Sequence, residues 1–303
     1  MDIRDISIDD TKDSKKLISK FASTGFQASK LWYATKLVNK MKKEKAKIYL
    51  TFTANMVASG LRGLFAELCK KKYIDVIITT AGALEHDFMR ACFDSKYKLG
   101  EFTTDDIKLH AHGINRIGNI LVSNKNYIYF EKEIISIFEK LWIKKRIISP
   151  SKLCYEMGAS LTSRKSFLYW CTKNKIPIFC PGITDGAIGL QAYFFKQRRK
   201  DFGIDVTKDM DALASITLNA EKTGGIILGG GISKHHAIGV NLLRGGFDYA
   251  VYITTAQPWD GSLSGARTNE AISWGKINKN AEHVTIDAEA TIAFPMLVAG
   301  LKL

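Results

Sequence analysis

One lysine stands apart from the many lysines of the chain. Lys276 lies near the end of the stretch "GARTNEAISWGKI", where it follows Ile272, Trp274 and Gly275, with Glu270 as the one acid nearby. A lysine acts as a nucleophile only after its ammonium has lost a proton, and apolar neighbours that exclude water favour the neutral amine. Such an arrangement costs stability and more often serves a function than not. The alternative is a lysine that extends its ammonium into solvent, with its stem on Trp274.

A histidine pair is the second candidate for chemistry. His235 and His236 follow a glycine turn in "GGGISKHH", and an imidazole can accept or donate a proton near neutral pH. The alternative is a pair of surface residues at the start of a helix. The motif "HAH" at 110–112 also lacks cysteine or carboxylate partners at metal-site spacing. We therefore expect no metal.

Composition points to an ordinary globular protein. The chain has 303 residues, of which 46% are hydrophobic and 24% charged. Its uncharged apolar runs are too short to span a bilayer, and the start "MDIRDISIDD" lacks the order of a signal peptide. We expect a soluble, cytoplasmic protein without a membrane partner. The five cysteines form no C-x-x-C motif, so we expect reduced thiols in the core.

The net charge of +14 is unevenly placed. Basic runs lie at 40–47, 70–72, 140–146 and 196–200. Solvated helix ends and loops explain such runs, and docking to an acidic partner is the alternative. Nucleic acid is the weaker option, because the runs are scattered and no stacking platform is interleaved with them.

From about residue 45 onward, short apolar runs alternate with helical patterns. Continuously apolar strands are typical of a sheet covered on both faces, and alternation with helices predicts a doubly wound, mostly parallel, Rossmann-like α/β fold. Helices are expected at 131–145 and 209–223, and another at 26–41 outside the sheet. We expect an N-terminal helical extension (1–45) and one NAD-binding α/β catalytic domain (46–303). The predicted strands are 47–54, 74–82, 176–184, 224–231, 248–256 and 283–291.

Small or polar residues follow most of the predicted strands. In open parallel sheets the ligand lies outside the carboxyl ends of the strands, so these ends predict one site assembled along that edge. Neither G-x-G-x-x-G in a strand–turn–helix setting nor a P-loop motif occurs. Any nucleotide must be held by a less common arrangement.

Several long motifs are shared with one family. The stretch at 229–277 resembles deoxyhypusine synthase, and so do "GFQAS", "TTAGALEHD", "HGINRIGN", "PGITDGAIG" and "ATIAFPMLVA". The likeness extends in order over most of residues 25–299. The short chain is more similar to the archaeal members than to the eukaryotic ones.

The resemblance implies a transferase that uses NAD and spermidine to modify one lysine of the translation initiation factor 5A precursor. Hydride passes from the carbon beside the secondary amine of spermidine to NAD, and Lys276 captures the resulting imine with loss of 1,3-diaminopropane. The 4-aminobutyl group then passes to the substrate lysine and is reduced by the same hydride. His235 matches the family's base, Glu270 its amine-binding carboxylate, and Trp274 lies where its ring can cover the polyamine.

The resemblance also implies which residues of this chain bind the substrate and the cofactor. For the substrate these are Glu85, His86, Glu270, Trp274, Gly261, Ser262 and Tyr252. For NAD they are Asn55, Thr80, Ala81, Gly82, Asp185, Gly230, Thr255, Ala256, Asp260, Ser264, Glu289 and Ala290. Members of the family are homotetramers, a dimer of dimers.

Some positions depart from the family. Leu190 and Leu263 replace aspartates that contact the polyamine in eukaryotic members, Gly239 replaces an asparagine, and Glu289 replaces the usual aspartate. These changes concern the identity of the amine that donates the 4-aminobutyl group. Two alternatives follow: a homospermidine-synthase-like enzyme with a small amine as acceptor, and a catalytically silent NAD-binding paralogue.

Overall fold

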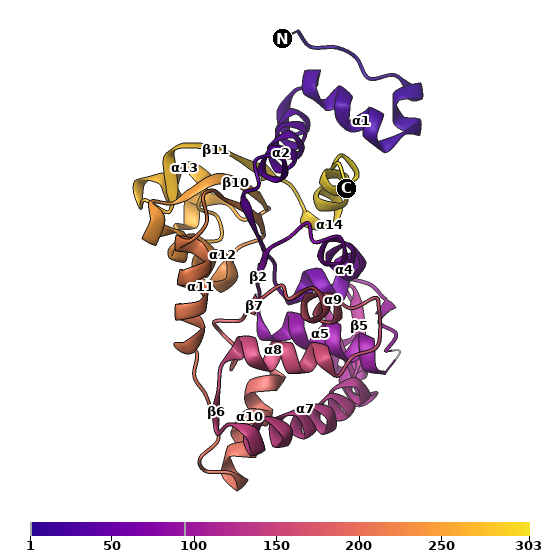
Figure 1. The fold of residues 1–303 in the computed structure, drawn as a ribbon. Helices are drawn as coiled ribbons and strands as arrows, with labels where there is room; N and C mark the ends of the chain where they lie inside the picture. The colour runs from indigo at the N-terminus through magenta and orange to yellow at the C-terminus, as the bar shows by residue number, and fades with distance from the viewer. Residues whose placement is uncertain (1, 94) are drawn as a thin grey trace. The chain divides into compact units, whose positions relative to one another are not determined.

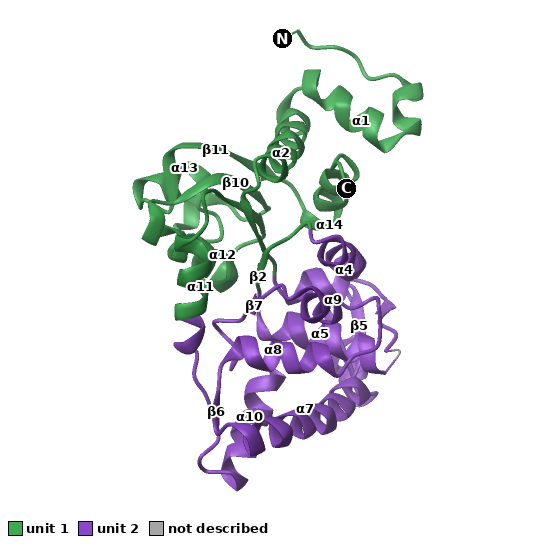
Figure 2. Ribbon diagram, in the orientation of Figure 1, with its two compact units in different colours: residues 1–52, 73–78, 211–303 green, residues 53–72, 79–210 purple. Residues whose placement is uncertain are grey.

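The computed structural model describes residues 2–93 and 95–303. The described chain forms two compact units, coloured separately in Figure 2. Unit 1 comprises residues 1–52, 73–78 and 211–303, and unit 2 comprises residues 53–72 and 79–210. The segment 1–45, which the sequence predicts as a separate extension, belongs to unit 1 together with the sheet (Met1 lies outside the described residues).

The predicted parallel sheet is present, and the α/β fold class is confirmed. It has six strands, of which the five in unit 1 lie in the order β11-β10-β9-β1-β2, all parallel. The sixth is β7 (Ile178–Phe179) in unit 2. Every predicted strand overlaps one of these six. The strands of unit 1 are β1 (Lys47–Thr51), β2 (Val76–Ile78), β9 (Thr223–Leu228), β10 (Phe247–Thr254) and β11 (Ile277–Asp287).

Helices cover both faces of the sheet in unit 1 (Figure 1). Neighbouring residues of a strand point to opposite faces. Thr223 of β9 donates to Asn241 of α12 (2.8 Å), whereas the next residue, Gly224, faces Met41 of α2. The helices of this unit are α1 (Ser14–Lys20), α2 (Phe26–Lys43), α11 (Lys208–Leu218, which starts in unit 2), α12 (Gly231–Asn241), α13 (Thr268–Ser273) and α14 (Ala290–Ala299), with 3-10 turns at Ile8–Lys12, Phe21–Ser23, Leu242–Arg244 and Pro258–Asp260.

Helix α2 confirms the helix predicted at 26–41. Its buried residues recur at helical spacing and face the sheet: Leu31, Ala34, Thr35, Leu37, Val38 and Met41. Lys30 pairs with Asp287 (3.3 Å), and Lys40 pairs with Glu282, so charged residues of α2 also hold β11. The predicted helix at 209–223 is shorter than expected, because its last residues form the turn into β9.

Unit 2 is mainly helical, with two small sheets that the sequence did not predict. Its helices are α3 (Ala54–Met56), a π-turn (Val57–Leu61), α4 (Arg62–Lys70), α5 (Ala81–Cys92), α6 (Asp106–Ala111), α7 (Asn124–Lys144), α8 (Pro150–Ala159), α9 (Phe167–Asn174) and α10 (Ala187–Arg198). The antiparallel sheet contains β3 (Lys98–Leu99), β5 (Ile120–Ser123) and β4 (Ile114–Ile117), and β6 (Ile147–Ile148) pairs with β8 (Gly203–Ile204).

A buried ion pair ties the helices of unit 2 together. Asp87 of α5 is fully buried and pairs with Arg62 of α4. Its second oxygen accepts hydrogen bonds from Ser166 Oγ (2.6 Å) and Leu168 N (3.0 Å) at the start of α9. Loss of one partner would leave a buried charge uncompensated, which is strongly destabilising.

Four of the five cysteines confirm the expectation of free thiols in the core, namely Cys69, Cys154, Cys171 and Cys180. Cys92 does not, because the end of α5 leaves it exposed. None of the helices in the described ranges combines the length and the apolar composition that a membrane crossing requires.

Gly224 tests the packing of α2 on the sheet. A Cβ at Gly224 would lie 2.6 Å from Met41 Sδ, and Met41 is fully buried. We expect Gly224→Ala to lower the free energy of unfolding by about 1–3 kcal/mol through overpacking. In a Met41→Ala background the same change should cost less, because the two sites are in contact. Additive effects in urea unfolding of the four proteins would contradict this packing.

Candidate active site

A pocket of about 310 Å³ lies within unit 1. Its walls come from α12, the loop that follows β10, α13 and the segment that leads into β11. It is lined by Lys234, His235, Ile238, Gly261, Leu263, Ala266, Arg267, Glu270, Ala271, Trp274 and Lys276. The pocket therefore brings together both predicted catalytic residues and three of the predicted substrate-binding residues.

Lys276 and His235 are direct neighbours in this pocket. Lys276 Nζ lies 3.4 Å from His235 Nε2, although 41 residues separate them in the chain. Partial burial lowers the pKa of His235, and the nearby charge of Lys276 lowers it further. The neutral imidazole is thus favoured, and a neutral imidazole can accept a proton from an adjacent amine.

The backbone on either side of the amine is fixed. Lys276 N donates to Ala271 O (2.9 Å), and Lys276 O accepts from Phe247 N (3.1 Å). Gly275 has φ 67°, a left-handed conformation that lets the chain leave α13 and enter β11. The position of Lys276 Cα is therefore set by α13 and β10.

Trp274 does not shield Lys276 as the sequence suggested. The ammonium lies 5.1 Å from the centroid of the indole ring, at the distance of a cation–π contact. However, 65% of Trp274 is exposed, and Ile272 does not line the pocket. In the single chain Lys276 is half-buried, so the expected removal from water is only partial.

Lys276 does not lie at the carboxyl edge of the sheet, where the site was expected. It precedes the first residue of β11, at the amino end of that strand, whereas the glycine-rich loops follow the carboxyl ends. The pocket reaches Lys276 because α12 runs back along the sheet and brings His235 with it. The site is thus assembled beside the sheet as well as at its carboxyl edge.

A buried lysine forms the base of the pocket. Lys234 is 1% exposed, and its ammonium donates to the carbonyl oxygens of Leu263 and Ala266, both at 2.7 Å. The same ammonium lies 4.5 Å from the ring centroid of Tyr252, which is fully buried in β10. Burial lowers the pKa of Lys234 to about 8, with Glu270 acting in the opposite direction.

The loop after β10 depends on glycine and on short polar contacts. A Cβ at Gly265 would lie 1.8 Å from the carbonyl oxygen of Gln257, so no other residue fits there. Asp260 accepts a hydrogen bond from Ser262 N (2.7 Å) across Gly261, which has φ 72°. These contacts place Gly261 and Leu263 on the pocket wall, and leave Ser262 exposed outside it.

Among the residues that line the pocket, Glu270 is the one acid. It lies on α13, which is anchored to β11 where Thr268 N donates to Thr285 Oγ1 (3.2 Å). The third cation of the lining, Arg267, pairs with Asp287 (2.5 Å). A cationic ligand would thus find one carboxylate in the walls that unit 1 provides.

Two of the predicted cofactor residues of unit 1, Gly230 and Ser264, meet at the start of α12. Gly230 comes so close to the loop after β10 that a Cβ would lie 2.5 Å from Ser264, and Gly231 N donates to Ser264 Oγ (3.1 Å). The N-cap residue Gly230 has no side chain to cap α12, and Ser264 engages only the Gly231 N–H, so the N–H groups that follow in the first turn can bind an anion. Thr255 is exposed after β10, and Ala256 N donates to Thr254.

Glu289 has a structural contact of its own. Its Oε2 accepts from Thr291 N (2.8 Å) and so caps α14, whose first residue is the buried Ala290. The carboxylate remains exposed. An exposed carboxylate can still bind ribose hydroxyls.

In unit 2, Glu85 caps a helix. Its side chain is 4% exposed, and Oε1 accepts from Ile188 N (2.8 Å) at the start of α10. Gly186 permits this approach, since a Cβ there would lie 2.5 Å from Oε1. Burial raises the pKa of Glu85 to about 7, against the effect of the Ile188 and Ala187 amides, and Asp185 adds to the rise.

His86 is a core residue. It is 4% exposed, and Nδ1 lies 2.7 Å from Tyr97 Oη. Burial, followed by the charge of Arg90, lowers the pKa of His86 to about 4. The neutral imidazole is therefore held by Tyr97 within unit 2.

A second helix N-terminus lies among the predicted cofactor residues. Thr80 precedes α5, its side chain accepts no capping hydrogen bond from the helix, and its Oγ1 is buried without a hydrogen-bond partner in the described chain. Ala81 is fully buried, and Gly82 allows close packing on α3, because a Cβ would lie 2.9 Å from Ala54 Cβ. Asn55, on α3, is exposed. An unpaired buried hydroxyl beside free amides fits a polar ligand group.

The two remaining positions lie on the surface of unit 2. Asp185 and Leu190 are both exposed, before and within α10. The substitution of Leu190 for an acid therefore leaves an apolar side chain 53% exposed.

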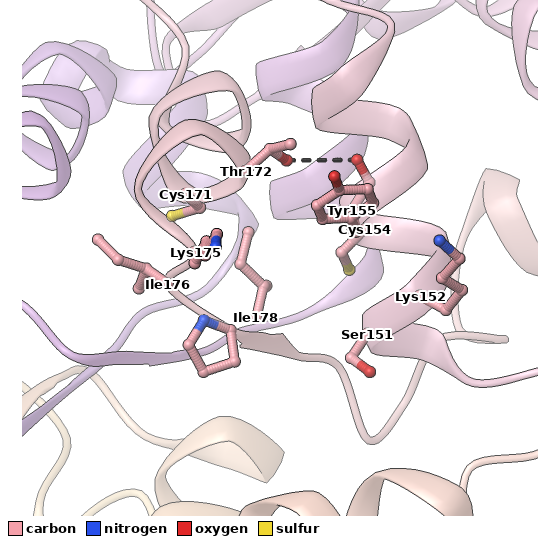
Figure 3. A pocket seen from close by; sticks show the side chains of 10 residues that line it. Ser151, Lys152, Cys154, Tyr155, Cys171, Thr172, Lys175, Ile176 and Ile178 are labelled. Carbon is pink, nitrogen blue, oxygen red and sulfur yellow. Dashed lines mark hydrogen bonds between the residues drawn. The ribbon is translucent and has the colours of Figure 1, made fainter.

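Another pocket of about 390 Å³ lies between α8, α9 and the strand β7 (Figure 3). None of the predicted site residues lines it; its walls are Ser151, Lys152, Cys154, Tyr155, Cys171, Thr172, Lys175, Ile176, Pro177 and Ile178. Within residues 2–93 and 95–303, no group of three or more His, Cys, Asp or Glu side chains is arranged to hold a metal ion.

Sequence reasoning missed Lys234 and Arg267 as pocket residues. A signal for Lys234 was available, because it shares the buried face of α12 with Ala237, Ile238 and Asn241 at helical spacing. A lysine on such a face needs acceptors for its ammonium. The carbonyl acceptors come from a loop about 30 residues later, which spacing alone does not indicate.

The fold and the pocket define a parallel α/β protein with an amine–imidazole pair, and the comparisons with known proteins define its family. The deoxyhypusine synthase family model ("DS: Deoxyhypusine synthase") matches residues 16–301. The chain is 45% identical to "Probable deoxyhypusine synthase" of Pyrococcus furiosus, over 96% of this chain and 91% of the relative. It is 44% identical to the protein of the same description from Thermoplasma acidophilum, over 98% and 96%.

A solved structure agrees. A crystal structure from Entamoeba histolytica, described in similarly provisional terms as a deoxyhypusine synthase, matches with a TM-score of 0.72 and 28% identity over 99% of this chain and 96% of that one. The chain belongs to the deoxyhypusine synthase family, as its motifs predicted.

The pKa of Glu85 has a consequence for stability. Because folding raises the pKa from 4.5 to about 7, its contribution is complete below about pH 4.5 and is lost as the pH rises through 7. Between these limits, the free energy of unfolding of the unmodified protein should fall by roughly 3 kcal/mol because of Glu85. We expect Glu85→Gln, which can still cap α10, to lack this fall. Urea unfolding at several pH values would measure it, and parallel pH profiles for both proteins would refute it.

Proposed function

We propose that the chain is a deoxyhypusine synthase that transfers the 4-aminobutyl group of spermidine to one lysine of the translation initiation factor 5A precursor, with NAD as cofactor. Membership of the family supports the reaction. The observation that carries the proposal to particular residues is the 3.4 Å contact between Lys276 Nζ and His235 Nε2 inside a pocket.

Lys276 is the proposed nucleophile. Toward an oxidised polyamine, its neutral Nζ forms a bond to the imine carbon, and the bond from that carbon to the departing nitrogen breaks with release of 1,3-diaminopropane. The 4-aminobutyl group is then held on Lys276 as an imine until the substrate lysine displaces it. His235 accepts and returns the protons that these exchanges of amine require.

The residues present fit NAD. When bound, NAD would supply a reversible acceptor for hydride. Taken separately, each unit has a helix start that offers backbone N–H groups to phosphate: α12 after Gly231 in unit 1, and α5 in unit 2. The unpaired hydroxyl of Thr80 offers a hydrogen bond, and Glu289 offers a carboxylate to ribose.

The amine substrate is proposed to bind along the indole of Trp274, with one ammonium toward Glu270. An indole attracts a cation and covers methylene groups, and the exposure of Trp274 leaves ring surface available beside the contact with Lys276.

The exposure of Trp274 also supports the proposal of a homotetramer. Leu242, Leu243 and Trp259 are also exposed in unit 1, by 49%, 56% and 86%, which is typical of a surface that another chain covers.

The test of the proposed function is an acceptor assay. The enzyme is incubated with NAD and spermidine labelled in the aminobutyl group, and either the factor 5A precursor or putrescine. Label on the protein lysine supports the proposal. Label that enters only small amines identifies a homospermidine-synthase-like enzyme, and no transfer to either acceptor identifies a silent paralogue; both outcomes refute the proposal.

The role of Lys276 has its own test. Lys276→Arg keeps the positive charge but a guanidinium cannot supply a neutral amine. We expect transfer to the factor 5A precursor to fall at least about 1,000-fold, since covalent catalysis is lost, while NAD binding measured by calorimetry is retained. Transfer at the rate of the unmodified enzyme would rule out Lys276 as the nucleophile.

The charge of the pocket predicts the effect of an added acid. Leu263 lines the pocket, in which Glu270 is the one acidic residue. We expect Leu263→Asp to lower the KM for spermidine about tenfold, equivalent to ~1.4 kcal/mol. Leu263→Asn is the control of matched shape and should not lower it. Equal KM values for both variants would show that charge at this position does not govern amine binding.

A further inference from the structure

Two of the four basic runs of the chain converge within unit 2. The basic patch comprises the cations of residues 139–146, at the end of α7, and of residues 196–201, at the end of α10. These 14 residues hold eight cations and two acids, a net charge of +6 out of the chain's +14. The cations are Lys140, Lys144, Lys145, Arg146, Lys196, Arg198, Arg199 and Lys200.

Packing fixes the two runs beside each other. Phe138 of α7 contacts Phe195 of α10 (ring centroids 5.6 Å apart) and Phe202 (5.2 Å), and β6 pairs with β8 immediately after the runs. Gly203 N donates to Arg146 O (3.0 Å). Figure 1 shows α7 and α10 of this unit side by side. The convergence is thus a consequence of the core.

A tryptophan lies at the centre of the patch. The guanidinium groups of Arg146 and Arg199 lie 3.9 and 4.3 Å from the ring centroid of Trp142. Trp142 Nε1 donates to Asp201 (2.8 Å), which also pairs with Arg146 (3.1 Å), and Arg199 pairs with Glu139 (3.6 Å). Both acids of the patch are therefore already engaged.

Six cations of the patch remain unneutralised. They are exposed, and none has an acidic partner in the part of the chain that the structure describes: Lys140, Lys144, Lys145, Lys196, Arg198 and Lys200, the last of which donates to the neutral side chain of Gln197 (3.0 Å). Helix C-termini attract cations through their dipoles, but that effect favours one or two charges in the last turn. Six such charges at the ends of two neighbouring helices exceed what the two helix ends require.

Exposed aromatic rings accompany these cations. Tyr193 and Phe194 of α10 are 58% and 49% exposed, with ring centroids 5.4 Å apart. Lys196 and Arg198 follow them at spacings of three and four residues, which places each cation beside a ring on the helix surface. The two runs are therefore not scattered as the sequence suggested, and two exposed rings adjoin the run at 196–200.

We propose that the basic patch, with Tyr193 and Phe194, binds single-stranded RNA. Lysine and arginine side chains would contact phosphates, and the two rings would stack on unpaired bases. An acidic protein would satisfy the charges but not the rings. The choice of RNA over DNA rests on the proposed function, since an enzyme that modifies a translation factor works among RNA-bound partners.

Binding of a fluorescent single-stranded RNA of about 12 nucleotides to the full chain tests the proposal, by anisotropy at several salt concentrations. With six phosphate contacts, log K should fall with log salt at a slope of about −4. The charge-reversed variant Lys144→Glu/Lys145→Glu/Arg198→Glu should bind at least roughly tenfold more weakly, with a slope shallower by about 2. Tyr193→Ala should weaken binding about tenfold without a change in slope.

A matched control separates this surface from overall charge. Lys15→Glu/Lys43→Glu/Lys71→Glu changes the net charge equally at exposed lysines outside the patch and should bind RNA at nearly the original affinity. Equal loss in both triple variants would overturn the proposal. So would equal affinity for single-stranded DNA, duplex RNA, polyglutamate or anionic lipid vesicles.

Aminobutyl transfer is measured on the same variants. The Lys144/Lys145/Arg198 variant should keep full transfer, since these residues line no part of the pocket. Transfer without RNA binding would refute only the RNA surface, whereas RNA binding without transfer in the unmodified chain would refute only the proposed function.

Discussion

The buried ammonium of Lys234 is the interaction on which the pocket depends. It joins α12 to the loop after β10 through the carbonyl oxygens of Leu263 and Ala266. A desolvated ammonium is costly unless acceptors surround it, so the loop must adopt the conformation that presents both carbonyl groups. That conformation in turn needs the absence of a side chain at Gly265. His235 is the next residue on α12, so the same anchor helps to set its position opposite Lys276.

This arrangement also shapes the electrostatics of the site. Lys234, Arg267 and Lys276 are cationic, and Glu270 is the acid among the lining residues. The positive potential of these groups disfavours protonation of His235. It also disfavours the binding of a ligand ammonium group. A polyamine would need carboxylates in addition to Glu270, because Leu263 in the lining supplies none. The backbone N–H groups at the start of α12 suit a phosphate group better than a cation.

The sequence predicted the sheet well, because its strands are continuous apolar runs and such runs are a strong local signal. Helix α2 was equally clear from the spacing of Leu31, Leu37 and Met41. The sheet formed by β3, β5 and β4 was not predicted, since its strands are only two to four residues long and partly exposed. Hydrophobic periodicity can be recognised only in strands that are long enough and buried, and these strands are neither.

The sequence predicted which residues form the site better than it predicted the contacts that these residues make. Family motifs selected Lys276, His235, Glu270 and Trp274, and the pocket contains all four. They could not show that Glu85 caps α10 or that His86 is held by Tyr97, because those partners are long-range contacts of the core. Nor could spacing show that residues 140–146 and 196–200 meet, since an aromatic cluster between α7 and α10 brings them together.

Trapping of the covalent intermediate tests the central claim most directly. The enzyme is incubated with NAD and spermidine, treated with borohydride, digested and analysed by mass spectrometry. We expect a reduced 4-aminobutyl adduct on the peptide that contains Lys276, with no adduct when NAD or spermidine is omitted. An adduct on another lysine, or turnover without any adduct on Lys276, would contradict it.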